Sequence, residues 1–67
     1  MKLKYMCYDV LMKNSGSEMT AVEVAEILNV RRHELVHAML LHLAENYIKI
    51  YAKKRGGEYR FWWKDIK

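Results

Sequence analysis

The sequence has no proline, a single cysteine and no uninterrupted apolar stretch longer than four residues. Cys7 alone cannot form an internal disulfide, and the first residues lack the apolar core of a secretory signal, so we expect an intracellular protein, cytoplasmic or nucleoid-associated. A membrane-spanning helix needs about 20 apolar residues, so we expect a soluble protein with no membrane partner. Clear breaks occur only at residues 14–17 and 55–57. Residues 1–67 are therefore expected to form one domain.

Acidic residues are the scarcer charged class. The chain has 12 Lys and Arg against 8 Asp and Glu, which gives a formal net charge of +4. A positive protein favours a polyanionic partner such as nucleic acid. Apolar residues make up 52% of the 67 residues, although a domain of this size buries only about 60% of its unfolded surface. We therefore expect some apolar surface to be kept for a partner.

The first predicted helix covers residues 2–13 and has two apolar sides. The side expected to face the core carries Leu3, Met6, Cys7 and Val10. A second stripe at spacings of three and four consists of Tyr5, Tyr8 and Met12. A one-sided surface helix does not need this second stripe, whereas a symmetric dimer needs a self-complementary patch. We therefore predict a homodimer interface at this stripe.

Two further helices, joined by a tight turn, are predicted between Thr20 and Glu45. Thr20 and Glu23 have the spacing of a capping box, and Asn29 can end the helix in a left-handed conformation. A very short strand is expected just before it, at residues 18–19. The last helix is expected to turn one side to the core, made of Leu35, Val36, Met39, Leu40 and Leu43. Its outward side then carries His33, Glu34, His37, Leu41 and Ala44.

Alternating residues predict a β-hairpin over residues 48–63, with two glycines at its tight turn. The side chains expected to close the core are Tyr59, Phe61 and Trp63, with Trp62 facing outward. Cations gather at the tip and on the returning strand, namely Lys53, Lys54, Arg55 and Arg60. Each phosphate that a cation neutralises releases a counterion, so we interpret these four residues as one cluster that approaches a nucleic-acid backbone together.

The order of these elements, and residues 19–35 in particular, resembles the winged helix-turn-helix family. This segment has the family's threonine-capped helix, small central residue, tight turn and recognition helix. The resemblance implies an α+β fold of three helices followed by a two-stranded wing. It also implies a double-stranded DNA-binding protein with its third helix in the major groove and its wing on the backbone or minor groove.

Within that resemblance, the third helix supplies two groups of candidate contacts. Arg31 and Arg32 lie beside its start and can reach phosphates. His33, Glu34 and His37 lie on its outward side, where Glu34 can accept from cytosine and a neutral histidine can bond a base edge. We expect a transcriptional regulator that acts by occupying DNA, without catalysis and without a cofactor.

Residues 33–37 also match the H-E-x-x-H pattern of zinc hydrolases. A catalytic zinc needs a third protein ligand and a substrate cleft. His42 is expected to face the core, on another side of the helix from His37, and so cannot complete the site. We interpret the match as a coincidence and predict no metal site and no catalytic residue.

Two other functions stay open beside DNA binding. The outward side of the third helix is weakly basic, which suits a protein-interaction adaptor on the same fold. Aromatic residues at 59–63 are interleaved with cations, which suits stacking on single-stranded nucleic acid.

Overall fold

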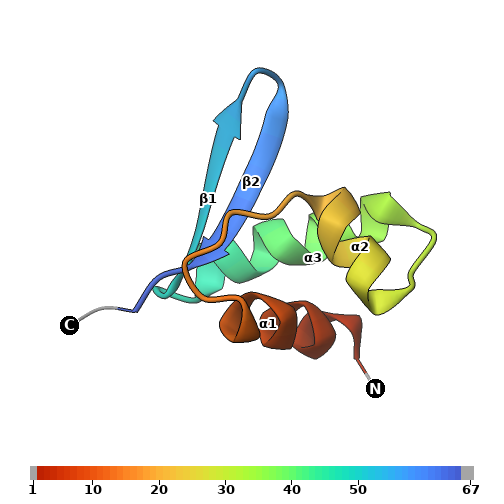
Figure 1. The fold of residues 1–67 in the computed structure, drawn as a ribbon, viewed down its shortest axis with the longest axis horizontal. Coiled ribbons are helices and arrows are strands. Elements are labelled where there is room, and N and C mark those ends of the chain that lie inside the picture. The colour runs from red at the N-terminus through yellow and green to blue at the C-terminus, as the bar shows by residue number, and fades with distance from the viewer. Residues whose placement is uncertain (1, 66–67) are drawn as a thin grey trace.

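The computed structural model describes residues 2–65 as three helices followed by a two-stranded hairpin (Figure 1). The elements are α1 (Leu3–Lys13), α2 (Ala21–Leu28), α3 (His33–Asn46), β1 (Ile50–Arg55) and β2 (Glu58–Trp63). The three helices pack together, and the hairpin projects away from them as a wing (Figure 1). This α+β layout is the winged-helix arrangement that the sequence predicts. No helix among residues 2–65 is long and apolar enough to cross a membrane.

Local signals fix both ends of α2. The Thr20 hydroxyl accepts from the Glu23 backbone N–H at 3.2 Å, and the Glu23 carboxylate accepts from the Thr20 N–H at 2.8 Å. This capping box satisfies two donors that the first turn of a helix leaves free. At the other end Asn29 adopts the left-handed conformation, with φ 58°, and its N–H donates to Ala25 and Glu26. Both predictions are confirmed.

The turn at Gly56 and Gly57 fixes the register of the wing. Both glycines have positive φ, 55° and 80°, which suits the tight two-residue turn of a hairpin. Because strand side chains alternate, the antiparallel register gives the wing two faces. The inner face carries Ile50, Ala52, Lys54, Tyr59, Phe61 and Trp63, and the outer face carries Tyr51, Lys53, Arg55, Glu58, Arg60 and Trp62.

A third short stretch of chain pairs with the wing. Met19 forms an isolated antiparallel bridge with Phe61, through two backbone hydrogen bonds of 2.8 Å. This bridge confirms the very short strand predicted before α2. It also ties the segment that enters α2 to β2.

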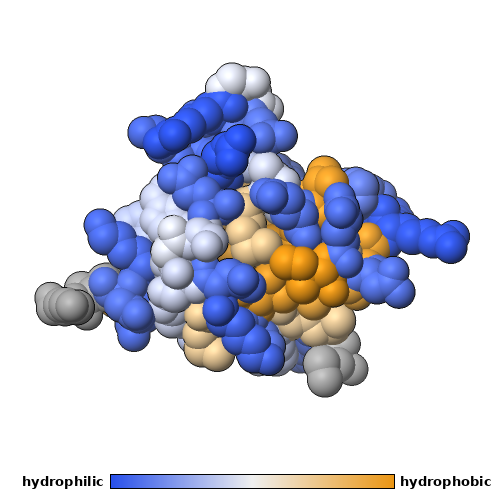
Figure 2. All heavy atoms as spheres, viewed as in Figure 1, coloured by the Kyte–Doolittle hydropathy of each residue, from blue (hydrophilic) through white to orange (hydrophobic). Residues whose placement is uncertain are grey.

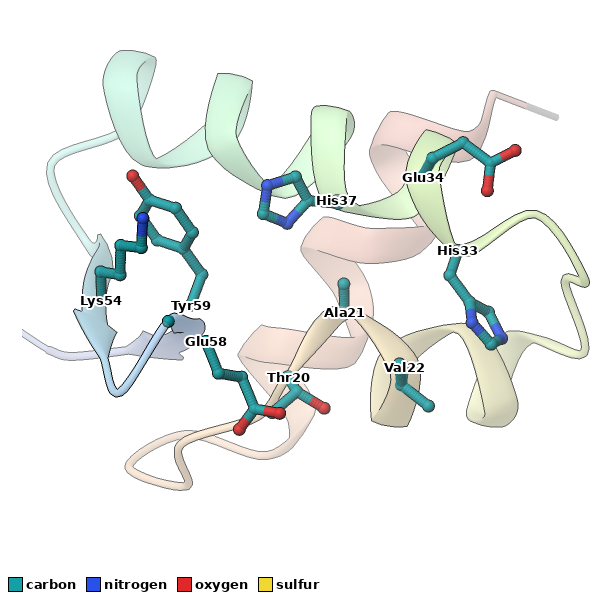
Figure 3. A pocket seen from close by; sticks show the side chains of 10 residues that line it. Thr20, Ala21, Val22, His33, Glu34, His37, Lys54, Glu58 and Tyr59 are labelled. Atoms are coloured by element: carbon teal, nitrogen blue, oxygen red, sulfur yellow. The ribbon is translucent and has the colours of Figure 1, made fainter.

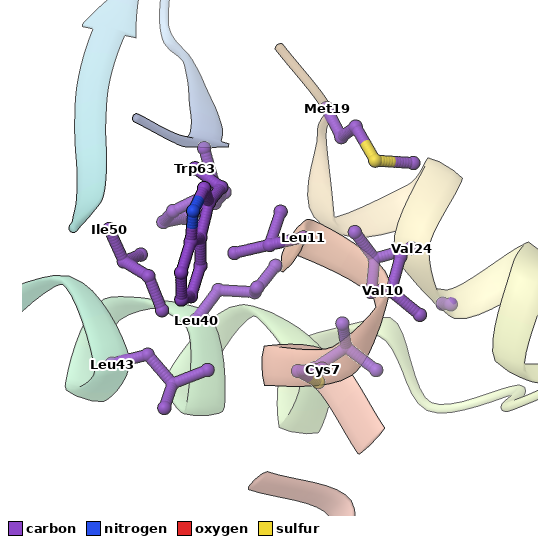
Figure 4. Close-up of a cluster of buried hydrophobic side chains, with 12 residues drawn as sticks. Cys7, Val10, Leu11, Met19, Val24, Leu40, Leu43, Ile50 and Trp63 are labelled. Atoms are coloured by element: carbon purple, nitrogen blue, oxygen red, sulfur yellow. The ribbon is translucent and has the colours of Figure 1, made fainter. Parts of the chain in front are cut away.

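The core lies where the base of the wing meets the three helices (Figure 4). Phe61, Leu11 and Leu40 are among its fully buried side chains. Phe61 and Trp63 are buried from the wing, as predicted, and Tyr59 packs partly buried beside them. The full set of buried apolar residues is Cys7, Val10, Leu11, Met19, Val24, Ala25, Val36, Leu40, Leu43, Ile50, Phe61 and Trp63.

The buried side of α3 differs from the predicted one. Leu35 is 42% exposed, and His42 is exposed and faces solvent rather than the core. Leu41 and Ala44, expected to point outward, pack partly buried against the core. The reason is the base of the wing, which packs against this flank of α3, where the His37 and Phe61 rings meet edge-on with centroids 6.0 Å apart. A one-sided helical pattern does not reveal such a second neighbour.

We predict that two identical substitutions in α3 separate the buried flank from the exposed one. Leu40→Ala removes a fully buried side chain and should lower the free energy of unfolding by about 2 to 5 kcal/mol. Leu35→Ala, the matched control, removes a side chain that is 42% exposed and should change it by less than about 1 kcal/mol. Urea unfolding followed by circular dichroism measures both. Equal losses would contradict the observed orientation of α3.

Cys7 is fully buried in α1, and burial raises the pKa of its thiol to about 11. Burial disfavours the thiolate, so the folded protein holds the thiol proton more tightly than the unfolded chain does. The stability from this group is therefore present below about pH 9 and is lost as pH rises toward about 11. We predict that the free energy of unfolding falls between about pH 9 and pH 11, and that the Cys7→Ala variant lacks this part of the fall. Parallel curves of unfolding free energy against pH for the two proteins would contradict this prediction.

Candidate nucleic-acid interface

A groove of about 550 Å³ lies between the start of α2, the first turns of α3 and the wing (Figure 3). All three side chains predicted to read bases, His33, Glu34 and His37, line it. The remaining lining residues are Thr20, Ala21 and Val22 beside and in α2, and Lys54, Gly57, Glu58 and Tyr59 in the wing. The fold therefore brings three separate parts of the sequence, within 20–22, 33–37 and 54–59, around one open surface.

The two histidines of this groove have different surroundings. The His37 ring meets Tyr59 edge-on, with ring centroids 5.4 Å apart, and is half-buried. His33 is exposed and points toward α2, away from His37 (Figure 3). His37 is thus fixed by packing against the wing, whereas His33 is free to meet a ligand.

An ion pair occupies the start of α3. Arg32 Nε donates to Glu34 Oε1 at 3.2 Å, and both side chains are largely exposed. The pKa of the Glu34 carboxyl is lowered, first by a hydrogen bond from the backbone N–H of Glu34 and then by the hydrogen bond from Arg32. Glu34 therefore stays a carboxylate and draws Arg32 toward itself. Arg31 is exposed and forms no ion pair with any residue in the range 2–65.

The cations of the wing lie on two faces. Lys54 is on the inner face, where its Nζ lies 5.8 Å from the Tyr59 ring centroid and the residue lines the groove. Lys53, Arg55 and Arg60 are on the outer face and do not line the groove. Arg60 also pairs with Glu58 at 3.4 Å. The four side chains therefore leave the wing from two faces, because neighbours in a strand point to opposite faces.

The H-E-x-x-H segment does not gather metal ligands. His33 and His37 point apart (Figure 3), and His42 is exposed beside Asn46, whose Nδ2 lies 3.4 Å from His42 Nδ1. Within residues 2–65 no three His, Cys, Asp or Glu side chains are close enough to hold a metal ion. His42 is separated from the other two by the rotation of the helix, although it faces solvent and not the core as predicted.

The predicted dimer stripe on α1 is divided. Tyr5 is 55% exposed and Met12 43% exposed. Tyr8 instead packs partly buried, with its ring edge-on to Tyr47 at 5.3 Å and to Trp63 at 5.1 Å. The loop after α3 and the end of β2 cover Tyr8, so an open stripe consists of Tyr5 and Met12 alone.

Sequence reasoning missed the contribution of α2 and of Glu58 to the groove. Val22, on the first turn of α2, is 43% exposed. Because the side chain is apolar, nothing in the sequence indicated that it lies at the surface. Glu58 could have been found, because a two-residue glycine turn pairs it with Arg55 at the tip. The groove therefore holds two carboxylates, from Glu34 and Glu58, beside Lys54.

Comparison with family models, with curated proteins and with solved structures found no match to this chain.

Proposed function

We propose that this protein binds double-stranded DNA without catalysis, with α3 in the major groove and the wing beside the backbone. The observation that carries the proposal is one groove lined both by His33 and Glu34 of α3 and by Lys54 of the wing. The major groove of B-DNA is about 12 Å wide and admits one α-helix. A helix flanked by a wing has the shape to enter that groove and touch an adjacent phosphate at once.

The charges around the groove favour backbone contact over base reading. Lys54 is an exposed cation that lines the groove, and Arg31 is an exposed cation just before α3. Glu34 repels phosphates and can accept a hydrogen bond from a cytosine amino group, while His33 can meet a base edge. Binding of this kind depends strongly on salt and only weakly on sequence. A small protein of this type regulates transcription by occupying DNA that other proteins need.

A second candidate function is a protein-interaction adaptor. A groove of about 500 Å³ follows α3 and β1 and is lined by Leu41, Ala44, Glu45, Tyr47, Ile48, Ile50, Tyr51 and Ala52. Ile48, one of these lining residues, is 79% exposed, which is unusual for a large aliphatic side chain. In Figure 2 hydrophilic residues cover the wing, whereas hydrophobic residues gather around α2. These apolar surfaces favour a protein partner in addition to DNA.

We further propose that two copies associate through α1. Tyr5 and Met12 are seven residues apart, two turns along one side of the helix, and both are exposed. A two-fold axis beside this stripe would bring each Tyr5 toward Met12 of the other copy. A dimer presents two α3 helices to one duplex and so doubles the contacts to it.

We predict that replacing Lys53, Lys54 and Arg55 together by Ala weakens binding to a random-sequence duplex by about tenfold or more at low salt. The slope of log affinity against log salt should also become shallower, by about 0.9 for each lost phosphate contact. Lys54→Ala alone should account for most of the loss, because only Lys54 of the three lines the groove. Fluorescence anisotropy with a labelled duplex at several salt concentrations measures both quantities.

The matched control removes the same charge from α1. Lys2, Lys4 and Lys13 lie in or next to α1 and none of them lines the groove, so their triple replacement by Ala should leave the affinity nearly unchanged. Equal losses for the two triple variants would show that only net charge matters. Duplex binding that ignores both salt and the wing variant would reject the DNA proposal.

We predict that Tyr5→Ser with Met12→Ser converts the protein to a monomer at concentrations where the unaltered chain is dimeric. Both side chains are exposed, so the change should remove apolar contact area without disturbing the core. Ile27→Ser with Leu35→Ser is the control, since these side chains are 56% and 42% exposed on other helices. Light scattering after size-exclusion chromatography reports the mass. A monomeric unaltered protein at high concentration would refute the dimer.

A further inference from the structure

The outer face of the wing carries a stacked aromatic pair among cations. Tyr51 and Trp62 are cross-strand partners, with ring centroids 5.7 Å apart and an interplanar angle of 15°. Lys64, which continues the alternation of β2, holds its Nζ 5.8 Å from the Tyr51 ring centroid. Toward the tip the next cross-strand pairs are Lys53 with Arg60 and Arg55 with Glu58. One carboxylate thus stands among four cations on this face.

Core packing does not explain this pair of rings. Tyr51 is 38% exposed and Trp62 is half-buried, and neither ring belongs to the core cluster or packs against it. Within residues 2–65, Trp62 meets no aromatic ring except Tyr51 and no cation lies over it. Of the indole, part stays exposed, and among these ring and cation contacts only Tyr51 stacks on it.

The positions of the cations on this face lower the stability of the unbound protein. Lys53 lies directly across from Arg60, and like charges in that position destabilise a strand pair. Glu58 partly neutralises Arg60 through an ion pair of 3.4 Å. Lys53 forms no ion pair with any of the described residues. A polyanion on this face would relieve the repulsion. An anion that also carries flat rings would use both features.

We propose that the outer wing face binds single-stranded DNA, with an unpaired base stacked on Trp62 beside Tyr51 and flanking phosphates on Lys53, Arg60 and Lys64. Aromatic platforms lined by cations bind single strands in this way, without reading their sequence. The choice of DNA over RNA rests on the proposed function, because the inner face of the same wing lines the duplex groove. One molecule could then hold a duplex on one face of the wing and the adjoining unpaired strand on the other.

The first test uses the unaltered protein and an oligothymidylate of roughly 10 nucleotides, within the usual site size for single-strand binding. The chain has two tryptophans, and the Trp63 indole is buried and donates to Asp65 at 2.9 Å. In a nitrogen-15 NMR titration, the Trp62 indole signal should shift while the Trp63 signal stays in place. An abasic strand of equal length should shift it far less. Equal shifts with both strands would overturn base stacking.

The second test separates the two faces. Tyr51→Thr with Trp62→Thr keeps residues suited to strands and should weaken oligothymidylate binding by about tenfold. Tyr51→Phe with Trp62→Phe keeps the rings and should retain most of the affinity. Lys54→Ala, on the inner face, should weaken duplex binding only. Circular dichroism checks that each variant is folded.

Distinct outcomes identify which proposal fails. An unaltered protein that binds oligothymidylate but no duplex would reject the proposed function and leave the outer face as a single-strand site. A Thr double variant that is folded and binds oligothymidylate normally would overturn the stacking site. Tighter binding of an oligouridylate of the same length would overturn the assignment to DNA.

Discussion

The register of the hairpin is the constraint on which both surfaces of this protein depend. Gly56 and Gly57 adopt positive φ, and the turn they form places Arg55 opposite Glu58. This first pair sets every further cross-strand pair down to Ile50 and Trp63. A slip of one residue in β2 would bury Arg60 and Trp62 in place of Phe61 and Trp63. Phe61 alone contributes about 1.5 to 3 kcal/mol by its burial, and a buried unpaired arginine would cost several more. Slippage is therefore excluded, and each cation of the wing has one fixed face.

The same hairpin decides how α3 is oriented. β2 is joined to the segment before α2 by the Met19 bridge, and its Phe61 and Tyr59 lie against His37. The flank of α3 that meets the wing is thereby covered, and the flank carrying Leu35 is left to solvent. The exposed first turn of α3 and Lys54 then line the same groove. The groove is thus a consequence of how the wing packs and not of the helix pattern alone.

Features set by neighbours in the chain were predictable from the sequence. The capping box at Thr20, the left-handed Asn29 and the alternating hairpin each depend on residues within a few positions. The rotation of α3, the burial of Tyr8 and the exposure of His42 depend on elements that pack from elsewhere. The separation of Lys53 from Lys54 is a different case. The alternation of side chains along a strand already implies that Lys53 and Lys54 point to opposite faces. Treating neighbouring cations as one cluster overlooked this alternation.

The placement of charge supports the proposal that this small domain binds DNA and reads its sequence weakly. The net charge of +4 is not spread evenly, because four cations and one carboxylate lie along the outer face of the wing. The groove instead mixes Lys54 with Glu34 and Glu58, and Arg32 is held by Glu34. Long-range attraction therefore acts mainly through the wing. In the proposed complex Lys54 could meet a phosphate without giving up an ion pair among the described residues, whereas Arg32 would first have to leave Glu34.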